Sequence, residues 1–416
     1  MATLLERRAR VLGPNVPTFY DEPVEIVRGE GVWLWDAGGR RYLDCYNNVA
    51  HVGHCHPSVV EAITRQAATL NTHTRYLHEG IVAYAERLVT TFDPSLSTVL
   101  MTCTGSEAND VALRMAQGVT GARGIIATDN TYHGNTLAVS HLSTHRPPPG
   151  GWPDHIRRVP APDGLRPGGL DGATFGQAVE RAIAELQAAG HGFAGLMLCP
   201  VFANEGLPDV APGFLDQAVT AVRKAGGLIL CDEVQPGFGR MGSHWWGHQW
   251  LGFAPDVVTL GKPMGNGHPV AGVVARADVM TAFREGFGYF NTFGGNPVAC
   301  AAAMAVLDVI EDEGLMPHAA RVSAALEARL KALDHPLIAG VRARGQFYAV
   351  EMARDGRPAP DVAARLVEGM KARGILMGRG GRANHVLKLR PPLPFDDGHA
   401  GTVADALAEA LAEVPA

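Results

Sequence analysis

The feature that most constrains the fold is an alternation of short apolar runs and helical patterns between about residues 97 and 275. Five runs have the length of strands, namely STVLMTC (97–103), GIIAT (124–128), GLMLCPV (195–201), GLILCDEV (227–234) and DVVTLG (256–261). They are continuous and rich in β-branched residues, which is typical of parallel strands covered on both faces. Helical patterns lie between them, at 107–118 and 175–190. The sequence therefore predicts a βαβ architecture.

The two ends of the chain have a different pattern. Residues 24–44 predict an antiparallel hairpin or meander with glycine turns. After about residue 300, a long helical pattern leads to a smaller α/β region that finishes in a second helix, 402–414. We therefore expect an α/β protein with a large domain over 56–298. Its small domain would be assembled from 1–55 and 299–416.

Composition argues against several classes of function. The net charge is −6, and charges of both signs are scattered, whereas a nucleic-acid-binding face would be basic. No stretch approaches the roughly 20 apolar residues that span a bilayer, and residues 1–13 do not have the pattern of a signal peptide. Six cysteines, several of them inside apolar runs, favour buried thiols. We expect a cytoplasmic protein that binds neither nucleic acid nor membrane.

The residues that follow the predicted strands are candidates for function, because ligands of open α/β sheets bind beyond the carboxyl ends of the strands. Asp232 follows one strand and Lys262 follows another. A structural ion pair between these two residues would also explain their presence. However, Lys262 is one of only five lysines among 36 basic residues. A buried lysine, unlike an arginine, can lose its proton and act as a nucleophile or base.

Two further strand ends carry residues suited to a flat, anionic ligand. Thr104, Gly105 and Ser106 begin a helix, where free N–H groups and a glycine can receive an anion, although an N-cap explains the same residues. Tyr132 and His133 follow the next strand and could cover a ring or pack as loop aromatics. A lysine, a carboxylate, an anion site and an aromatic cover together describe a site for pyridoxal 5'-phosphate (PLP).

Seven segments of the chain together resemble the class-III, fold-type I PLP-dependent aminotransferases. In order, they are YLDCYNNVAHVGHCHP (42–57), TGSEAND (104–110), TYHG (131–134), DEVQPGFGR (232–240), TLGKPMGNGHP (259–269), NTFGGNP (291–297) and LKLRPPLPF (387–395). The resemblance covers essentially the whole chain. It implies the fold-type I architecture with a mostly parallel seven-stranded sheet in the large domain, and PLP as cofactor.

The resemblance assigns roles around the cofactor ring. Lys262 resembles the lysine that binds the PLP aldehyde, and Asp232 the carboxylate that keeps the pyridine nitrogen protonated. These two are the expected catalytic residues. Val234 would pack on the ring, Gln235 would lie near the ring oxygen, and Tyr132 would stack on the ring.

The resemblance also assigns residues around the ring and its phosphate. Gly105 and Ser106 match the phosphate site, and His133 belongs to the cofactor site beside the stacking aromatic residue. Thr292 matches a threonine that reaches the phosphate from the neighbouring subunit. This match implies a homodimer with shared active sites and leaves open whether dimers pair into tetramers.

Other kinds of site were considered. His51, His54, Cys55 and His56 have a spacing open to zinc. The resemblance places them in a turn before a helix, so we expect no metal. The lysine segment is not a P-loop, because Asp256 stands where a glycine is required and proline follows the lysine. The sequence has no recognisable helix-turn-helix segment, which argues against a PLP-binding transcription regulator.

Two reactions of the family fit the sequence. Residues 47–57 and 71–78 are similar to the subgroup that contains ethanolamine-phosphate phospho-lyases, yet related chains with much the same motifs are aminotransferases. Asn204 lies where amino-acid and GABA aminotransferases carry a glutamate that screens an arginine, which favours an ω-transaminase. We expect amino transfer from an amine or ω-amino acid to pyruvate or another keto acid. The alternative is elimination of phosphate from ethanolamine phosphate or a similar phosphorylated amine.

The substrate pocket is less well defined by the sequence. A substrate carboxylate requires a guanidinium or ammonium group, and Lys388 replaces an arginine that some relatives carry. Arg379 and Arg382 are further basic candidates of the same region. The residues expected to line the pocket, each also explicable as an ordinary surface residue, are Tyr20, Trp33, Asn48, Arg75, Tyr76, Lys388 and Arg390.

Overall fold

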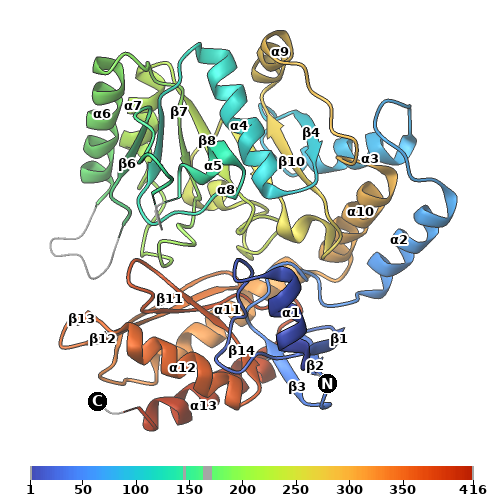
Figure 1. The fold of residues 1–416 in the computed structure, drawn as a ribbon, viewed down its shortest axis with the longest axis vertical. Coiled ribbons are helices and arrows are strands. Elements are labelled where there is room, and N and C mark those ends of the chain that lie inside the picture. The colour runs from blue at the N-terminus through green and yellow to red at the C-terminus, as the bar shows by residue number, and fades with distance from the viewer. Residues whose placement is uncertain (1, 144–146, 163–170, 415–416) are drawn as a thin grey trace.

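A seven-stranded sheet forms the centre of the large domain in the computed structural model, which describes residues 2–143, 147–162 and 171–414 (Figure 1). Its strand order is β4-β10-β9-β8-β7-β5-β6. The strands are β4 (Thr98–Thr102), β5 (Ile125–Thr128), β6 (Ile156–Val159), β7 (Gly195–Leu198), β8 (Leu228–Asp232), β9 (Val257–Leu260) and β10 (Ala271–Ala275). Strand β10 runs antiparallel to both of its neighbours, β4 and β9, and the other pairs are parallel, so the mostly parallel seven-stranded sheet is confirmed. Strands β6 and β10 lie outside the five runs predicted.

Helices cover both faces of this sheet, which explains why its strands are continuous apolar runs. Along β8, Ile229 and Cys231 enter one core, whereas Leu228 and Leu230 enter the other. The first core includes α2 (Pro57–Thr69), α3 (Glu79–Val89), α6 (Gly172–Ala188), α7 (Asp216–Lys224), α8 (Gly247–Leu251) and α10 (Pro297–Asp312). The second includes α4 (Gly105–Thr120), α5 (Leu137–Ser140) and α9 (Ala277–Gly286).

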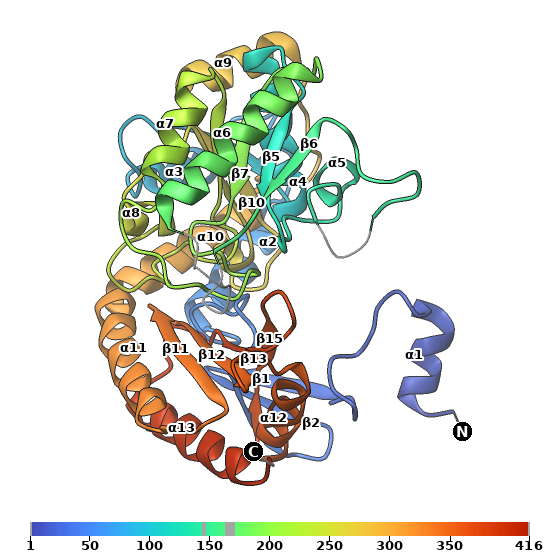
Figure 2. The same cartoon turned by 90° about the vertical axis from the view of Figure 1, so that its left-hand side faces the viewer.

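The small domain combines both ends of the chain, as Figures 1 and 2 show. The predicted N-terminal meander is present as β1 (Ile26–Glu30), β2 (Trp33–Asp36) and β3 (Arg41–Asp44). Strand β3 pairs with β14 (Ile375–Leu376), which joins the N-terminal segment to the C-terminal one. A second sheet contains β11 (Ile338–Arg344), β12 (Phe347–Arg354), β16 (Val386–Leu389) and β15 (Gly378–Gly380), with β13 (Arg357–Pro358) beside β12. Helices α11 (Leu315–Lys331), α12 (Pro360–Ala372) and α13 (Asp397–Ala412) pack in the same core.

The change from one core to the other falls within α11, whose Leu315 and Ala319 still belong to the core around the large sheet. Helix α10 contributes Ala299 to Ile310 to the core around the large sheet, whereas Val322 of α11 belongs to the small domain. The predicted domain limit, residue 298, is the second residue of α10, and residues of the large core continue beyond it into the start of α11.

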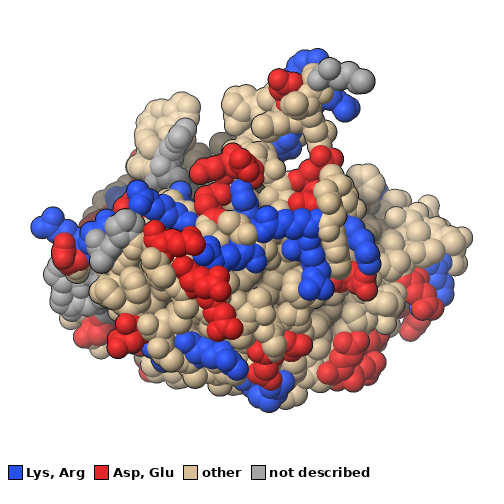
Figure 3. All heavy atoms as spheres, turned by 90° about the horizontal axis from the view of Figure 1, so that it is seen from below, with Lys and Arg blue, Asp and Glu red and all other residues tan. Residues whose placement is uncertain are grey.

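The surface has features that bear on partners. Helix α1 (Leu4–Leu12) has no buried residue and lies to one side of the body (Figure 2). On the face drawn in Figure 3, basic and acidic side chains are interspersed, so this face is not uniformly basic. Within the described residues, no helix combines the length and apolar character needed to cross a membrane.

Candidate active site

The strand ends bring Asp232 and Lys262 to one edge of the sheet. Asp232 is the last residue of β8 and pairs with Thr259 on β9, and Lys262 begins the short 3-10 turn η1 (Lys262–Gly265) just after β9. Lys262 has φ of +29°, a left-handed value that is uncommon and strained outside glycine and is often found at functional sites. A cavity at this edge is lined by Gly105, Ser106, Tyr132, His133, Gly134, Cys199, Asn204, Asp232, Val234, Gln235 and Lys262.

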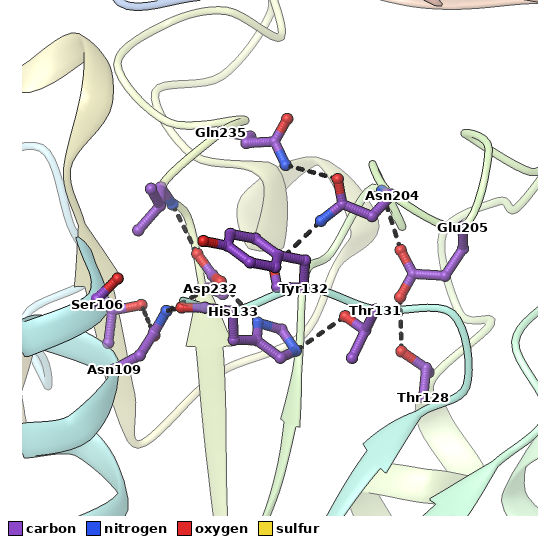
Figure 4. Close-up of polar contacts among 12 residues, drawn as sticks. Ser106, Asn109, Thr128, Thr131, Tyr132, His133, Asn204, Glu205, Asp232 and Gln235 are labelled. Atoms are coloured by element: carbon purple, nitrogen blue, oxygen red, sulfur yellow. Dashed lines mark hydrogen bonds and ion pairs between the residues drawn. The ribbon is translucent and has the colours of Figure 1, made fainter. Parts of the chain in front are cut away.

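The Asp232 carboxylate is held by three hydrogen bonds (Figure 4). His133 Nδ1 donates to Oδ2 at 2.6 Å, and the backbone N–H of Val234 donates to Oδ1 at 3.0 Å. The other nitrogen of His133 lies 3.0 Å from Thr131 Oγ1. A carboxylate fixed in this way has a defined direction in which it can meet a cationic partner in the cavity.

Asn109 of α4 is a member of this network that the sequence analysis did not identify. Its Nδ2 donates to Asp232 Oδ2 at 3.1 Å and to the His133 carbonyl at 2.6 Å. Its Oδ1 accepts from Thr259 Oγ1 at 2.6 Å. Asn109 is buried and lies on the fifth residue of the helix, where an asparagine gives no local signal of function. It links helix α4 to strands β8 and β9.

The amine of Lys262 is tuned by its surroundings. The side chain is accessible from the cavity, which differs from the buried lysine that we expected, and protein encloses it on the other sides. Desolvation lowers the pKa of Lys262, an effect that Asp232 opposes and Arg390 reinforces. A lowered pKa increases the fraction of neutral amine, the form that attacks a carbonyl or accepts a proton.

The N-terminus of α4 provides an anion site. Thr104 and Glu107 form a capping box, in which Glu107 N donates to Thr104 Oγ1 and Thr104 N donates to Glu107 Oε2. The N–H groups of Gly105 and Ser106 then remain without an intrahelical partner. A Cβ at Gly105 would lie 2.9 Å from both γ-carbons of Val234, and one at Gly134 would lie 2.6 Å from Ser106 Oγ. Both glycines permit a close approach around this anion site.

Val234, Tyr132 and Gln235, which we expected around the cofactor ring, line the same cavity. Val234 is buried, whereas Tyr132 is 43% exposed. Gln235 Oε1 accepts hydrogen bonds from Lys388 Nζ at 3.4 Å and Arg390 Nη1 at 3.2 Å. The Glu205 carboxylate is not bonded to Lys388 or Arg390. Its Oε1 accepts from Thr128, and its Oε2 accepts from the backbone N–H of Asn204.

Several expected pocket residues lie elsewhere in this chain. The Tyr20 hydroxyl bonds to the backbone of Met377, and Trp33 lies 3.9 Å from the Arg41 guanidinium, both in the small domain. Asn48 is buried, and its amide nitrogen has no partner among the described residues. Arg379 is exposed and donates to the Pro360 carbonyl, whereas Arg382 pairs with Asp129.

Arg75, Tyr76 and Thr292 lie together on the surface rather than in the cavity. Arg75 stacks 3.9 Å above the ring of Phe290, and Tyr76 stacks on His73. Thr292 is exposed two residues after Phe290. None of the three is among the residues that line the cavity of this chain.

The histidine-rich turn has separate partners for each side chain. His51 bonds to Phe238 and Arg240, His54 to Asp44, and His56 to Glu313. Behind Asp232, a buried group of Cys231, Glu233 and His248 has the geometry of possible metal ligands. The Glu233 carboxylate in that group already accepts from two backbone N–H groups and from His248.

Comparison with known proteins identifies the family. The sequence model of the class-III aminotransferases matches residues 17–411. The chain belongs to the class-III aminotransferase family. This family is PLP-dependent, and the lysine, the anchored carboxylate and the α4 N-terminus are suited to hold PLP. The resemblance, the fold class and the cofactor expected from the sequence are thereby confirmed.

Individual relatives belong to two reaction types. A Drosophila melanogaster alanine–glyoxylate aminotransferase 2-like protein is 38% identical, covering 94% of this chain and 83% of the relative. Ethanolamine-phosphate phospho-lyase homolog 1 of Caenorhabditis elegans is 35% identical over 98% of this chain and 93% of its own length. Among solved structures, a phospholyase from Arthrobacter in complex with phosphoethanolamine is 42% identical, with a TM-score of 0.95 and coverage of 99% of this chain and 100% of that one.

Proposed function

We propose that the chain is a PLP-dependent phospho-lyase that eliminates phosphate from ethanolamine phosphate or a similar phosphorylated amine. The observation that carries the proposal is the Arg390 guanidinium beside Gln235, a residue of the cavity wall. Lys388 and Arg390 both contact Gln235, and neither forms an ion pair with any carboxylate of the residues that the structure describes. A phosphate dianion offers more charge to such a site than a carboxylate does.

Arg390 is the group best placed to meet the substrate phosphate. It is partly exposed, and its guanidinium lies 4.8 Å from the centre of the Tyr46 ring. Asn204 contributes an amide near Gln235 where a screening glutamate would lie in other branches, and Glu205 is turned toward Thr128. Arg390 therefore remains available to an anionic ligand. A guanidinium binds phosphate in bidentate geometry.

The residues divide the chemistry as follows. PLP, when bound, supplies the electron sink that makes the carbon next to the amine acidic. Lys262 accepts the proton from that carbon, since its lowered pKa leaves a neutral amine. The C–O bond on the adjacent carbon then breaks, and phosphate leaves with the bonding electrons. Addition of water to the remaining fragment releases an aldehyde and ammonia. Asp232 is held by His133 and Asn109, and its carboxylate would keep the pyridine nitrogen of PLP protonated.

The comparisons support this order of the two candidate reactions. The Arthrobacter phospholyase is 42% identical to the chain, and the similar solved ω-transaminase from Thermomicrobium roseum is 26% identical. The ω-transaminase predicted first from the sequence remains the second candidate, because the Drosophila relative named as aminotransferase 2-like is 38% identical. In that reaction Lys262 would return the proton to the cofactor, and no phosphate would be released.

Replacement of Arg390 tests the proposal. Arg390→Met should lower kcat/KM for ethanolamine phosphate by about tenfold to a hundredfold, because charge-assisted hydrogen bonds contribute about 1.5–3 kcal/mol. The exposed Arg379→Met variant of the same domain is the matched control and should keep the wild-type value. An unchanged kcat/KM in Arg390→Met would remove the phosphate-binding role of Arg390. Absence of phosphate release by the wild-type protein would contradict the lyase proposal itself.

A homodimer with shared active sites belongs to the same proposal. Four apolar side chains are strongly exposed around Thr292 and Arg75, namely Tyr76, Leu77, Phe290 and Phe293, at 65%, 101%, 45% and 70%. Exposed apolar residues clustered on two adjacent loops are typical of an interaction surface. We propose that a second copy covers them and receives Thr292 at its own cofactor phosphate.

We also propose that the protein is cytoplasmic, which fractionation of the source cells would check.

A further inference from the structure

Lys388 occupies an unusual position for a lysine. It lies in the middle of β16, opposite Ala349 of β12, and its side chain is only 6% exposed. Its Nζ donates to the Ala203 carbonyl at 2.5 Å and to Gln235 Oε1 at 3.4 Å. Among the described residues, no carboxylate lies within ion-pair distance of this amine. A buried amine without a counter-ion is costly, so its retention calls for a specific contact to explain it.

Lys388 does not line the cofactor cavity. Gln235 lines the cavity, and Lys388 reaches it from the side of the small domain. A ligand in the cavity therefore meets Gln235, and Lys388 acts on that ligand only through the amide. This placement differs from direct contact with a substrate carboxylate, the role expected from the sequence.

The amides next to Lys388 form a chain with one polarity. Both basic side chains, Lys388 and Arg390, donate to Gln235 Oε1. Gln235 Nε2 donates to Asn204 Oδ1 at 3.3 Å, and Asn204 Nδ2 donates to the Tyr132 carbonyl at 3.1 Å (Figure 4). Reversal of the Gln235 amide would place its N–H groups against the donor groups of Arg390 and Lys388 and its oxygen against the Asn204 oxygen. The polarity is thus set at the cationic end.

We propose that Lys388 is a positioning residue that, with Arg390, fixes the Gln235 amide so that an N–H group is presented to the cofactor cavity. One N–H of Gln235 Nε2 bonds to Asn204, which leaves the second for an acceptor atom in the cavity. The preferred acceptor is an electron-rich oxygen of the bound PLP. The role concerns the cofactor before any substrate arrives, so it is independent of whether the reaction is elimination or amino transfer.

A double-mutant cycle tests this role on the PLP-loaded protein without substrate. The variants are Lys388→Met, Gln235→Leu and the double variant, and the readouts are the dissociation constant for PLP and the pH titration of its visible absorption. Each single variant should weaken PLP binding by about tenfold, the size expected for loss of one hydrogen bond to a charged or electron-rich group. The double variant should resemble Gln235→Leu alone, because Lys388 acts through that amide.

Lys371→Met is the matched control. Lys371 belongs to the same domain, donates to the Glu22 carbonyl and pairs with Glu368, and its replacement should leave both readouts unchanged. Additive effects of Lys388→Met and Gln235→Leu would overturn the proposal, as would a wild-type titration in Lys388→Met. If Lys388→Met does not fold, Lys388→Gln serves instead, since it retains an N–H donor. It should give a smaller, still non-additive effect, and additivity there would equally contradict the role.

Discussion

Single residues of this site are defined by what surrounds them more than by their type. Lys262 lines the cavity just after β9, whereas Lys388 lies within β16 and contacts Gln235. Desolvation lowers the pKa of both amines. Of these two lysines, only Lys262 lines the cavity, so only Lys262 is assigned the catalytic role. The resemblance separated the two lysines, but it did not give the contact of Lys388 with Gln235, because that contact is set by the packing of the small domain against the large one.

Replacement of Lys262 tests its assignment. Lys262→Ala should bind PLP without a covalent bond, and the visible absorption band of the lysine-linked cofactor should be absent. Activity should fall by at least about a thousandfold, because the same side chain serves as nucleophile and base. Absorption spectra before and after dialysis give the measurement, with Lys371→Met as control. A wild-type band that survives in Lys262→Ala would show that another lysine binds the cofactor.

At the scale of elements, helix α4 connects the two ends of the cofactor site. Its N-terminal residues Gly105 and Ser106 line the cavity, and Asn109 one turn later holds Asp232. The sequence predicted this helix and its anion site, because the glycine and the capping residues are local signals. It did not predict Asn109, since the contact depends on where β8 and β9 lie. Strand β6 was missed because IRRV contains two arginines, and β10 was missed because an antiparallel insertion between parallel strands has no local signal.

Replacement of Gly105 tests the close approach at the start of α4. Gly105→Ala would place a methyl group 2.9 Å from the γ-carbons of Val234, so helix or valine must shift. We expect PLP affinity to fall by about tenfold or more, as measured by equilibrium titration. Gly401→Ala in α13 is the matched control, because a Cβ there meets no atom within 4 Å. Unchanged PLP affinity in Gly105→Ala would show that the phosphate lies elsewhere.

At the scale of the whole molecule, buried polar contacts connect the two domains. The Arg240 guanidinium follows β8 and donates to the carbonyls of Gln346 and Pro391 in the small domain. It also donates to His51 Nδ1, and His51 Nε2 donates to the Phe238 carbonyl at 2.6 Å. Both ring nitrogens of His51 are therefore engaged in the neutral form. The sequence indicated two domains, but it gave no sign of these contacts, because they join segments far apart in the chain.

Acid should destabilise the protein through His51. Burial and the charge of Arg240 lower the pKa of His51 well below its ordinary value of 6.5. Below about pH 6.5 the unfolded chain binds a proton that the folded chain does not, so stability falls as pH falls, with a slope up to about 1.4 kcal/mol per pH unit. Urea unfolding between pH 7.5 and 5 measures this slope. His51→Gln should reduce it, whereas the exposed His244→Asn control should not. An unchanged slope in His51→Gln would contradict the assignment.

Shared active sites can be tested by subunit mixing. Lys262→Ala and Thr292→Asp should each be inactive as homodimers, the first for lack of the lysine and the second because its carboxylate repels the partner's cofactor phosphate. A heterodimer contains one site with both wild-type residues, so an equal mixture should recover roughly a quarter of wild-type activity. Light scattering would establish the dimer. A dimeric mixture that stays inactive would place Thr292 in its own subunit's site, and an active Thr292→Asp homodimer would place it outside the sites altogether.

The most direct test of the proposed reaction counts turnovers on ethanolamine phosphate with no keto acid present. A phospho-lyase regenerates its cofactor in every cycle, so the account predicts many equivalents of inorganic phosphate and acetaldehyde per active site. A transaminase converts its cofactor to the amino form once and then stops until a keto acid is added. Consumption of about one equivalent of ethanolamine phosphate per active site without release of phosphate, resumed on addition of pyruvate, would contradict the account. That result would assign the chain to amino transfer.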